Sequence, residues 1–189
     1  GLTLPEGQEW RSAVINPDRI LRDAQRARQL GSEATIVSMH WGNEKESQAN
    51  SMQTGIAETL TASGFVDLIV GHHAHVVQPI EQVNGVWVMY GLGNVLSNLP
   101  TDERWPANSQ DAVIATINLT KRPSGKISFD RPQVTPTWVD KRNGWVIRDV
   151  LTMLKDPSTS YGTARELELS LVRTTRVLGE FIVPYASLP

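Results

Sequence analysis

The sequence has no cysteine, and this absence excludes several kinds of site at once. Without thiols the chain can form neither a disulfide nor a thiolate metal site, and it has no cysteine nucleophile. An excess of one charge is also missing, because 18 basic and 20 acidic residues give a net charge of −2. Proteins that bind nucleic acid by neutralising phosphates normally carry a basic excess. We therefore expect no nucleic acid among the partners of this chain.

Long apolar runs are missing as well. The longest, residues 65–70, contains Asp67 and falls far short of the roughly 18 residues that a membrane span needs. We therefore predict no membrane span, and expect this chain by itself to be soluble. Apolar residues still make up 40% of the 189 residues, which is enough for the core of one domain. The prediction is a single domain over residues 1–189.

The first half of the chain alternates between helical and strand patterns. Amphipathic helices are predicted over residues 17–30 and 51–63, and each is followed by a short apolar strand, residues 34–39 and 67–70. The first strand reads as buried on both faces, and the second helix is expected to turn Met52 inward. This alternation is typical of an α/β fold with a largely parallel sheet.

The second half has a different pattern. Asn84-Gly85, between residues 76–83 and 86–90, is a strong signal for a β-hairpin. A second hairpin is predicted from residues 112–119 and 126–129, followed by a strand at 134–139 and helices at 146–155 and 163–179. The fold class is therefore mixed α/β, with parallel strands first and antiparallel hairpins later.

The four histidines follow the two predicted parallel strands. His40 comes directly after the first strand, and His72, His73 and His75 come directly after the second. Ligands of open α/β sheets bind at the carboxyl ends of the strands, where these side chains would meet. Imidazole is the commonest metal ligand in proteins, so His40, His73 and His75 are the predicted metal ligands and catalytic residues. In extended backbone, His73 and His75 would present both rings on one side.

Three segments in this region carry a resemblance to a known family. Met39–Glu44, Val70–Ile80 and Tyr90–Asn94 resemble, in the same order, three motifs of the bacterial CapA family of capsule and poly-γ-glutamate biosynthesis proteins. Ala74 stands where that family usually has proline, and Gly91 where it has serine. The family belongs to the calcineurin-like metallophosphatase superfamily. The resemblance thus implies the C-terminal part of a two-sheet sandwich flanked by helices, with a dinuclear centre of divalent manganese, zinc or iron.

The resemblance also implies roles for single residues. His40 resembles the isolated histidine ligand of one metal, and His73 and His75 resemble the pair that divides between the two metals. Four further residues are expected at the rim or behind the ligands: Trp41, Glu44, His72 and Asn94.

The early motifs of the family, which supply the bridging carboxylate and the remaining ligands, have no match in residues 1–35. We therefore expect at most one ion here and little or no activity from this chain alone. The expected partner is a missing N-terminal segment or a second copy of the chain. The resemblance implies that the parent protein is a phosphoesterase-like metal-dependent hydrolase at the cell envelope or outside the cell. Its substrate would be an anionic polymer or a phosphorylated compound.

Two other interpretations remain open. The chain could be a non-catalytic module that binds an anionic polymer or scaffolds a surface polymer synthase. Five tryptophans would then line a surface: Trp41, Trp87, Trp105, Trp138 and Trp145. Alternatively, His40, His73 and His75 could hold a single zinc ion with one water, as in mononuclear zinc hydrolases.

Overall fold

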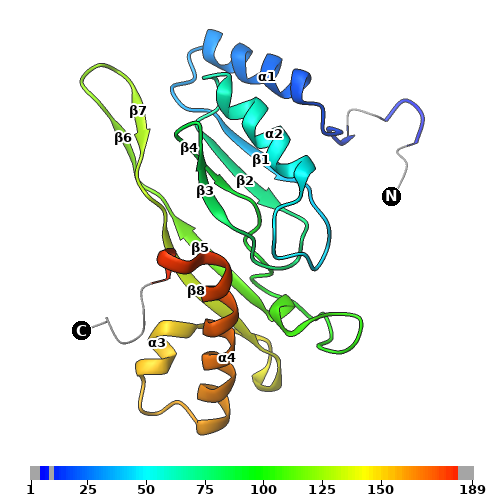
Figure 1. Cartoon of the computed structure of the whole chain (residues 1–189), viewed down its shortest axis with the longest axis vertical. Helices are drawn as coiled ribbons and strands as arrows, with labels where there is room; N and C mark the ends of the chain where they lie inside the picture. The colour runs from blue at the N-terminus through cyan, green and yellow to red at the C-terminus, as the bar shows by residue number, and fades with distance from the viewer. Residues whose placement is uncertain (1–4, 9–10, 183–189) are drawn as a thin grey trace.

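A mixed four-stranded sheet forms the upper half of the molecule in the computed structural model, which describes residues 5–8 and 11–182 (Figure 1). The strand order is β1-β2-β4-β3. Their bounds are Ile36–His40 for β1, Leu68–His72 for β2, Ile80–Val83 for β3 and Val86–Met89 for β4. β1, β2 and β4 run parallel, and β3 returns antiparallel to β4 through the predicted Asn84-Gly85 turn.

Two helices cover one face of this sheet. Helix α1 spans Pro17–Gln29 and begins at Asn16, whose side chain accepts a hydrogen bond from the Arg19 backbone. Helix α2 spans Ser51–Ala62 and begins with a reciprocal capping box between Asn50 and Gln53. Both predicted helices are confirmed. The core beneath them is built mainly from Met39, Trp41, Ala57, Leu60, Val66, Ile69, Val88 and Tyr90.

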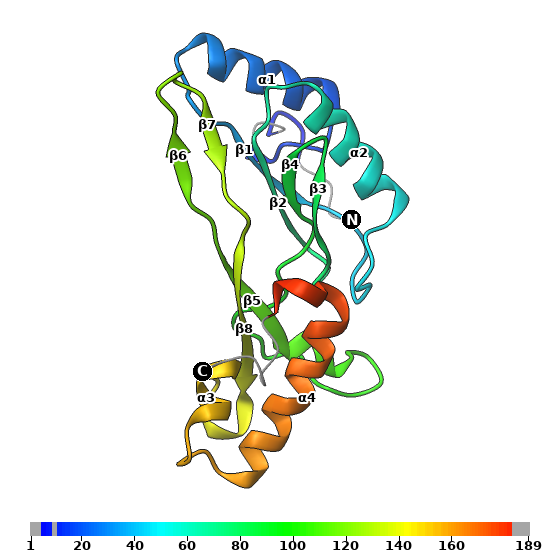
Figure 2. The same ribbon diagram turned by 60° about the vertical axis from the view of Figure 1, so that its left-hand side comes forward.

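The lower half is antiparallel. Strands β5 (Asp111–Thr116), β8 (Gln133–Asp140) and β9 (Val146–Asp149) form one sheet in the order β5-β8-β9. Strands β6 (Leu119–Lys121) and β7 (Ile127–Phe129) form a hairpin that extends upward beside the first sheet (Figure 2). Helices α3 (Val150–Lys155) and α4 (Tyr161–Leu178) pack on the lower sheet. Short 3-10 turns occupy Ala107–Gln110, Lys141–Asn143 and Gly179–Phe181.

A second core joins the two halves. It packs Leu68, Val77, Ile80 and Met89 of the first sheet region against Val113, Leu178 and Ile182. The fold is therefore a mixed α/β arrangement of a metallophosphatase-like type, as the sequence predicts, with parallel strands first and antiparallel strands later. No helix within residues 5–8 and 11–182 is long and apolar enough to cross a membrane.

The predicted helix over residues 146–155 is wrong in its first part. Residues 146–149 form β9, which pairs with β8 from Thr137↔Asp149 to Asp140↔Val146. The helix begins only at Val150, where the Asp149 side chain accepts a hydrogen bond from the Thr152 backbone. β9 is the second strand of a hairpin with β8 that is closed over residues 141–145, and this strand pairing decides the conformation against the helical pattern.

Two burial predictions for the first sheet are also wrong. Among the described residues β1 pairs only with β2 and is an edge strand, and Ile36 is 53% exposed rather than covered on both faces. Met52 is 45% exposed, because α2 turns Gln53, Ala57 and Leu60 inward instead. Gln53 is therefore buried where the apolar pattern predicted Met52 to be.

Candidate functional site

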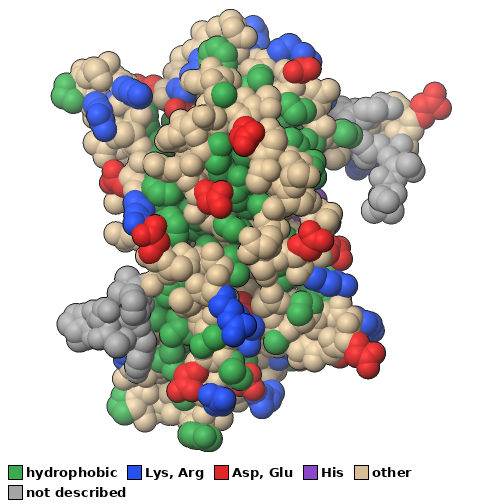
Figure 3. Space-filling model, viewed as in Figure 1, with side chains coloured by type: hydrophobic (Ala, Val, Ile, Leu, Met, Phe, Trp, Pro, Cys, Tyr) green, Lys and Arg blue, Asp and Glu red, His purple; other side chains and the backbone are tan. Residues whose placement is uncertain are grey.

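The histidines meet at the carboxyl edge of the first sheet. His40 and His72 are the last residues of β1 and β2 and lie opposite each other in the parallel register. They line a cavity of about 210 Å³ together with His73, His75 and Asn94. In Figure 3 a histidine surface is visible at the right-hand side, near the junction of the two halves. The predicted convergence of the two strand ends is thus present.

The ring geometry divides the three predicted ligands. The ring centroids of His40 and His73 lie 4.5 Å apart, and those of His73 and His75 lie 6.2 Å apart. A zinc ion lies about 2.1 Å from a coordinating nitrogen, so two rings that share an ion have centroids about 5 Å apart. The His40–His73 pair fits that spacing. Within the described part of the chain no three His, Cys, Asp or Glu side chains are placed to hold one ion, so the single-zinc alternative gains no support.

The backbone around the histidines is strained. His73 and His75 have φ values of 103° and 59°, so the His-x-His segment is bent and not extended as the sequence suggested. Lys45, which faces this loop through a 2.8 Å hydrogen bond from its N–H to the Ala74 carbonyl, has a φ of 70°. Each such residue costs about 1–3 kcal/mol, and this strain is typical of functional sites. Three of the five non-glycine residues with positive φ in the described ranges lie here.

Asn94 fixes the position and the tautomer of His75. Its side-chain Nδ2 donates to the carbonyls of His75 and Ser109 at 2.9 and 3.0 Å. Asn94 Oδ1 therefore faces His75 Nδ1 at 2.9 Å as an acceptor. The proton of the neutral ring must then sit on Nδ1, and the lone pair on Nε2 stays free for a metal ion or a proton. Asn94, expected at the rim, contacts a predicted ligand directly.

Trp41 links the site to the core. Its backbone N–H donates to the His72 carbonyl at 3.0 Å, and its indole Nε1 donates to the Tyr90 carbonyl at 2.9 Å. The indole also stacks on Tyr90, with ring centroids 5.7 Å apart. The close contact of Trp41 and Tyr90 with the backbone of β2 requires glycine at position 71. A Cβ there would lie 2.0 Å from the Tyr90 carbonyl oxygen and 2.4 Å from Trp41 Nε1. Trp41 is thus a buried support beneath the histidine loop.

A buried pair of glutamines holds the loop after β1. Gln78 donates from Nε2 to the carbonyls of Glu46 and Gln48 at 2.9 and 3.1 Å, and its Oε1 accepts from Gln53 Nε2 at 2.9 Å. Both glutamine side chains are fully buried. Sequence patterns did not predict this pair, although Gln78 lies within one of the segments that carry the family resemblance.

Two further residues flank the cavity and were also missed as site residues. The ring of Trp105 meets His75 edge-on, with centroids 5.3 Å apart and an interplanar angle of 88°. Lys45 Nζ lies 4.7 Å from the centroid of the same Trp105 ring. No sequence motif links Lys45 or Trp105 to the histidines, so sequence patterns could not place them at the site. By contrast, Glu44 is exposed and is not among the residues that line the cavity.

The pKa of His40 lies below its ordinary value of 6.5. Partial burial is the largest cause, and the neighbouring rings of His73, His72 and His75 add to it, because positive charge on several imidazoles together is unfavourable. The histidine cluster thus favours the neutral form of His40, which is the form that binds metal ions.

A surface made of the five tryptophans is not present. Trp41 and Trp138 are buried, with 1% and 4% of their surface exposed. Trp145 is 49% exposed, and its Nε1 donates to Asn98 at 3.1 Å. Two of the five indoles are thus core residues, and this basis for the polymer-binding alternative is wrong.

The fold and the site define a mixed α/β protein with a histidine-lined cavity at the carboxyl edge of its parallel strands. Within that class the chain belongs to the family described as "Bacterial capsule synthesis protein PGA_cap", whose model matches residues 3–99, just over half of the chain. The match includes all three segments that carry the family resemblance.

Two curated relatives show the same likeness. The PGA biosynthesis protein CapA of Bacillus subtilis (strain 168) is 33% identical over 113 residues, which cover 58% of this chain and 28% of the relative. The capsule biosynthesis protein CapA of Bacillus anthracis is 28% identical over 106 residues, which cover 54% of this chain and 25% of the relative. The chain thus spans about a quarter of the length of these relatives.

Proposed function

We propose that this chain supplies the histidine ligands of a metal-dependent hydrolase that acts in poly-γ-glutamate or capsule production. The observation that carries the proposal is the 4.5 Å approach of the His40 and His73 rings from the ends of two neighbouring parallel strands. The strained backbone at His73 and His75 adds support, because such strain persists where a site requires it.

The donor set fits one part of a dinuclear metal centre. His40 and His73 would hold one ion, and His75, whose Nε2 is free, would serve the other. None of the carboxylates in the described part of the chain lines the cavity. The proposal therefore places the carboxylate ligands outside residues 5–8 and 11–182, in another segment or another chain. When bound, such ions lower the pKa of a water molecule and neutralise charge on the substrate.

The other residues of the site have roles that do not depend on the ion. Asn94 holds His75 in the Nδ1-protonated tautomer. Lys45 and Trp105 provide a cation and an aromatic face beside His75, which suits an anionic substrate. Gln78 and Trp41 fix the two loops that carry the ligands.

The test is an assay of a protein of the full length of the relatives that contains this chain. Phosphoesters and γ-glutamyl oligomers are offered with manganese, zinc or iron. We expect metal-dependent hydrolysis that His73→Ala abolishes and that His72→Ala, at an exposed position, leaves largely intact. Hydrolysis that is unchanged in His73→Ala, or no hydrolysis of either substrate with any of the metals, would contradict the proposal.

A further inference from the structure

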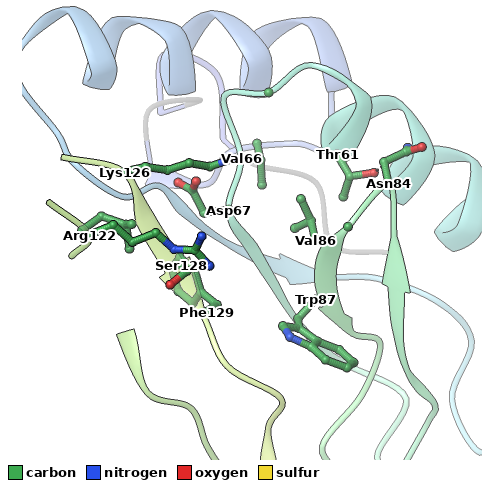
Figure 4. Close-up of a pocket in the computed structure, with 13 residues that line it drawn as sticks. Thr61, Val66, Asp67, Asn84, Val86, Trp87, Arg122, Lys126, Ser128 and Phe129 are labelled. Carbon is green, nitrogen blue, oxygen red and sulfur yellow. Dashed lines mark hydrogen bonds between the residues drawn. The ribbon is translucent and has the colours of Figure 1, made fainter. Parts of the chain in front are cut away.

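A second cavity lies at the opposite end of the first sheet. It has a volume of about 490 Å³, within the size range of ligand sites, and separates the β6–β7 hairpin from the starts of β2 and β4. Figure 4 shows Arg122 and Lys126 on the hairpin side, and Asp67 and Trp87 on the sheet side. We call it the hairpin cavity. Asp67 directly precedes β2 and His72 is its last residue, five residues further on, so the two cavities are about 17 Å apart along the strand.

Two cations project from the hairpin into this cavity. Arg122 and Lys126 are paired across the turn, because the Arg122 N–H donates to the Lys126 carbonyl at 2.9 Å. Residues directly opposite each other in a hairpin present their side chains on the same face, and like charges at such positions repel. Both side chains extend from the hairpin toward the sheet in Figure 4. In the described part of the chain no ion pair or side-chain hydrogen bond involves either cation.

The acid that lines the cavity does not neutralise these cations. The Asp67 carboxylate is paired with Arg28 and also accepts a hydrogen bond from the Thr35 N–H at 2.7 Å. Lys121, the neighbouring cation of the hairpin, is paired separately with Glu33. Two positive charges therefore remain without a counter-charge on one side of the cavity. Blue side chains are visible at the hairpin tip at the upper left of Figure 3.

The lower part of the cavity is apolar. Trp87 and Phe129 both line it, and both are labelled below the two cations in Figure 4. The Trp87 Nε1 atom is buried, so the indole offers the cavity apolar surface and not a donor. Two cations above an apolar floor suit a ligand that has carboxylates separated by methylene groups.

We propose that the hairpin cavity is a binding site for an anionic polymer, and that it holds a carboxylate-bearing segment of poly-γ-glutamate. This inference rests on the proposed function, since the polymer is the expected substrate or product of the histidine site. Binding at the hairpin cavity would hold one part of the chain while another part reaches the histidines at the other end of β2. The second site would thus select polymers over short γ-glutamyl compounds.

Titration calorimetry of this chain with a γ-glutamyl oligomer of defined length, at low salt and with a chelator present, tests the proposal. We expect the Arg122→Ala/Lys126→Ala variant to bind at least about ten-fold more weakly than the parent chain. The matched control is Lys155→Ala/Arg176→Ala, which removes the same charge from exposed positions on α3 and α4. Melting temperatures of both variants verify that the fold is retained.

Three results would overturn the inference. They are an equal loss of affinity in the two double variants, no loss in the hairpin variant, and displacement of the oligomer by inorganic phosphate at equal concentration. The last would assign the cavity to small anions.

The same titration with His73→Ala separates this inference from the proposed function. Because the chelator is present, oligomer binding should be unchanged in that variant. Loss of oligomer binding in His73→Ala would place the polymer at the histidine site and contradict the second site. If the histidines bind no metal, the proposed function fails, but the binding of the oligomer at the hairpin cavity can still be measured.

Discussion

The upper half of the molecule and the lower half are stabilised in different ways. The upper half carries all four histidines and Gly71 at a close contact between backbone segments. Two of these histidines, and Lys45 beside them, have positive φ. The lower half has two ion pairs whose carboxylates are buried, Asp111–Arg173 and Asp140–Arg148. The family model matches residues 3–99, which contain the upper sheet and its helices. Strain is therefore concentrated where the family resemblance and the candidate chemistry lie.

This difference has a physical basis. Strained backbone and close crossings hold the histidines in one arrangement, and they require specific residues such as glycine. Ion pairs and apolar contacts in the lower half can be replaced by other packing of similar volume. Substitutions in the upper half should therefore affect both the site and the fold, and those in the lower half only the fold.

The largest effect is expected from Gly71→Ala. The new Cβ would lie 2.0 Å from the Tyr90 carbonyl oxygen, which belongs to the backbone and cannot move aside. We expect a loss of more than about 4 kcal/mol in unfolding free energy, or no folded protein. Gly55→Ala is the control, because that position in α2 is open and the change should stabilise by about 0.5–1 kcal/mol. Urea denaturation followed by circular dichroism measures the unfolding free energy of both variants. Equal stability of the two would contradict the close contact between Gly71 and the Tyr90 backbone.

The next effect concerns the lower half. Arg173→Ala leaves the Asp111 carboxylate, only 2% exposed, without the two hydrogen bonds at 2.6 and 2.8 Å that it now accepts. We expect a loss of about 3–5 kcal/mol in unfolding free energy. Arg142→Ala breaks the exposed pair with Glu166 and should cost less than about 1 kcal/mol. Chemical denaturation tests the pair, and similar losses in both variants would show that burial of Asp111 is unimportant.

Asn94→Ala should have a smaller effect on stability and a clear effect on the site. It leaves two carbonyls and His75 Nδ1 without their partner, which costs about 1–3 kcal/mol. Nitrogen NMR of His75 should change from the Nδ1-protonated form to a mixture of tautomers. Asn98→Ala, at an exposed position, should leave the His75 spectrum unchanged. A His75 tautomer that stays the same without Asn94 would refute the assigned role.

The smallest effect is the titration of Tyr90. Burial first, and then the charges of Glu81 and Glu58, raise its pKa from 10.0 to about 12. The stability contributed by the neutral phenol is fully present below pH 10 and is lost as the pH rises through about 12. The difference in phenolate absorbance between the parent chain and Tyr90→Phe isolates the titration of Tyr90, which should occur near pH 12. A titration of Tyr90 near its ordinary value of 10.0 would contradict its burial.

Sequence patterns predicted the upper half well because its signals are local. The two amphipathic helix patterns, the Asn84-Gly85 turn and the histidines after two apolar strands all lie within short windows. The strand at residues 146–149 was missed although its partner β8 ends only a short turn earlier, because residues 146–155 were assigned to one helix. Lys45 and Trp105 were missed for a different reason, since only the folded chain brings Trp105 beside His75 and Lys45 over the Trp105 ring.

The edge position of β1 also depends on tertiary structure. A short apolar strand looks alike in sequence whether it has one neighbour or two, and the exposed Ile36 shows that β1 has one here. The partner expected from the sequence is a missing N-terminal segment or a second copy of the chain. The free edge of β1 can pair with a strand from either of these partners.

The central claim is that the histidines form a metal site, and metal stoichiometry tests it most directly. Elemental analysis would follow loading of the chain with zinc and, separately, manganese, in the parent sequence and in the His40→Ala, His73→Ala and His72→Ala variants. We predict close to one bound ion in the parent and in His72→Ala, and loss of that ion in both His40→Ala and His73→Ala. No bound metal in the parent, or equal binding in all the variants, would contradict the account.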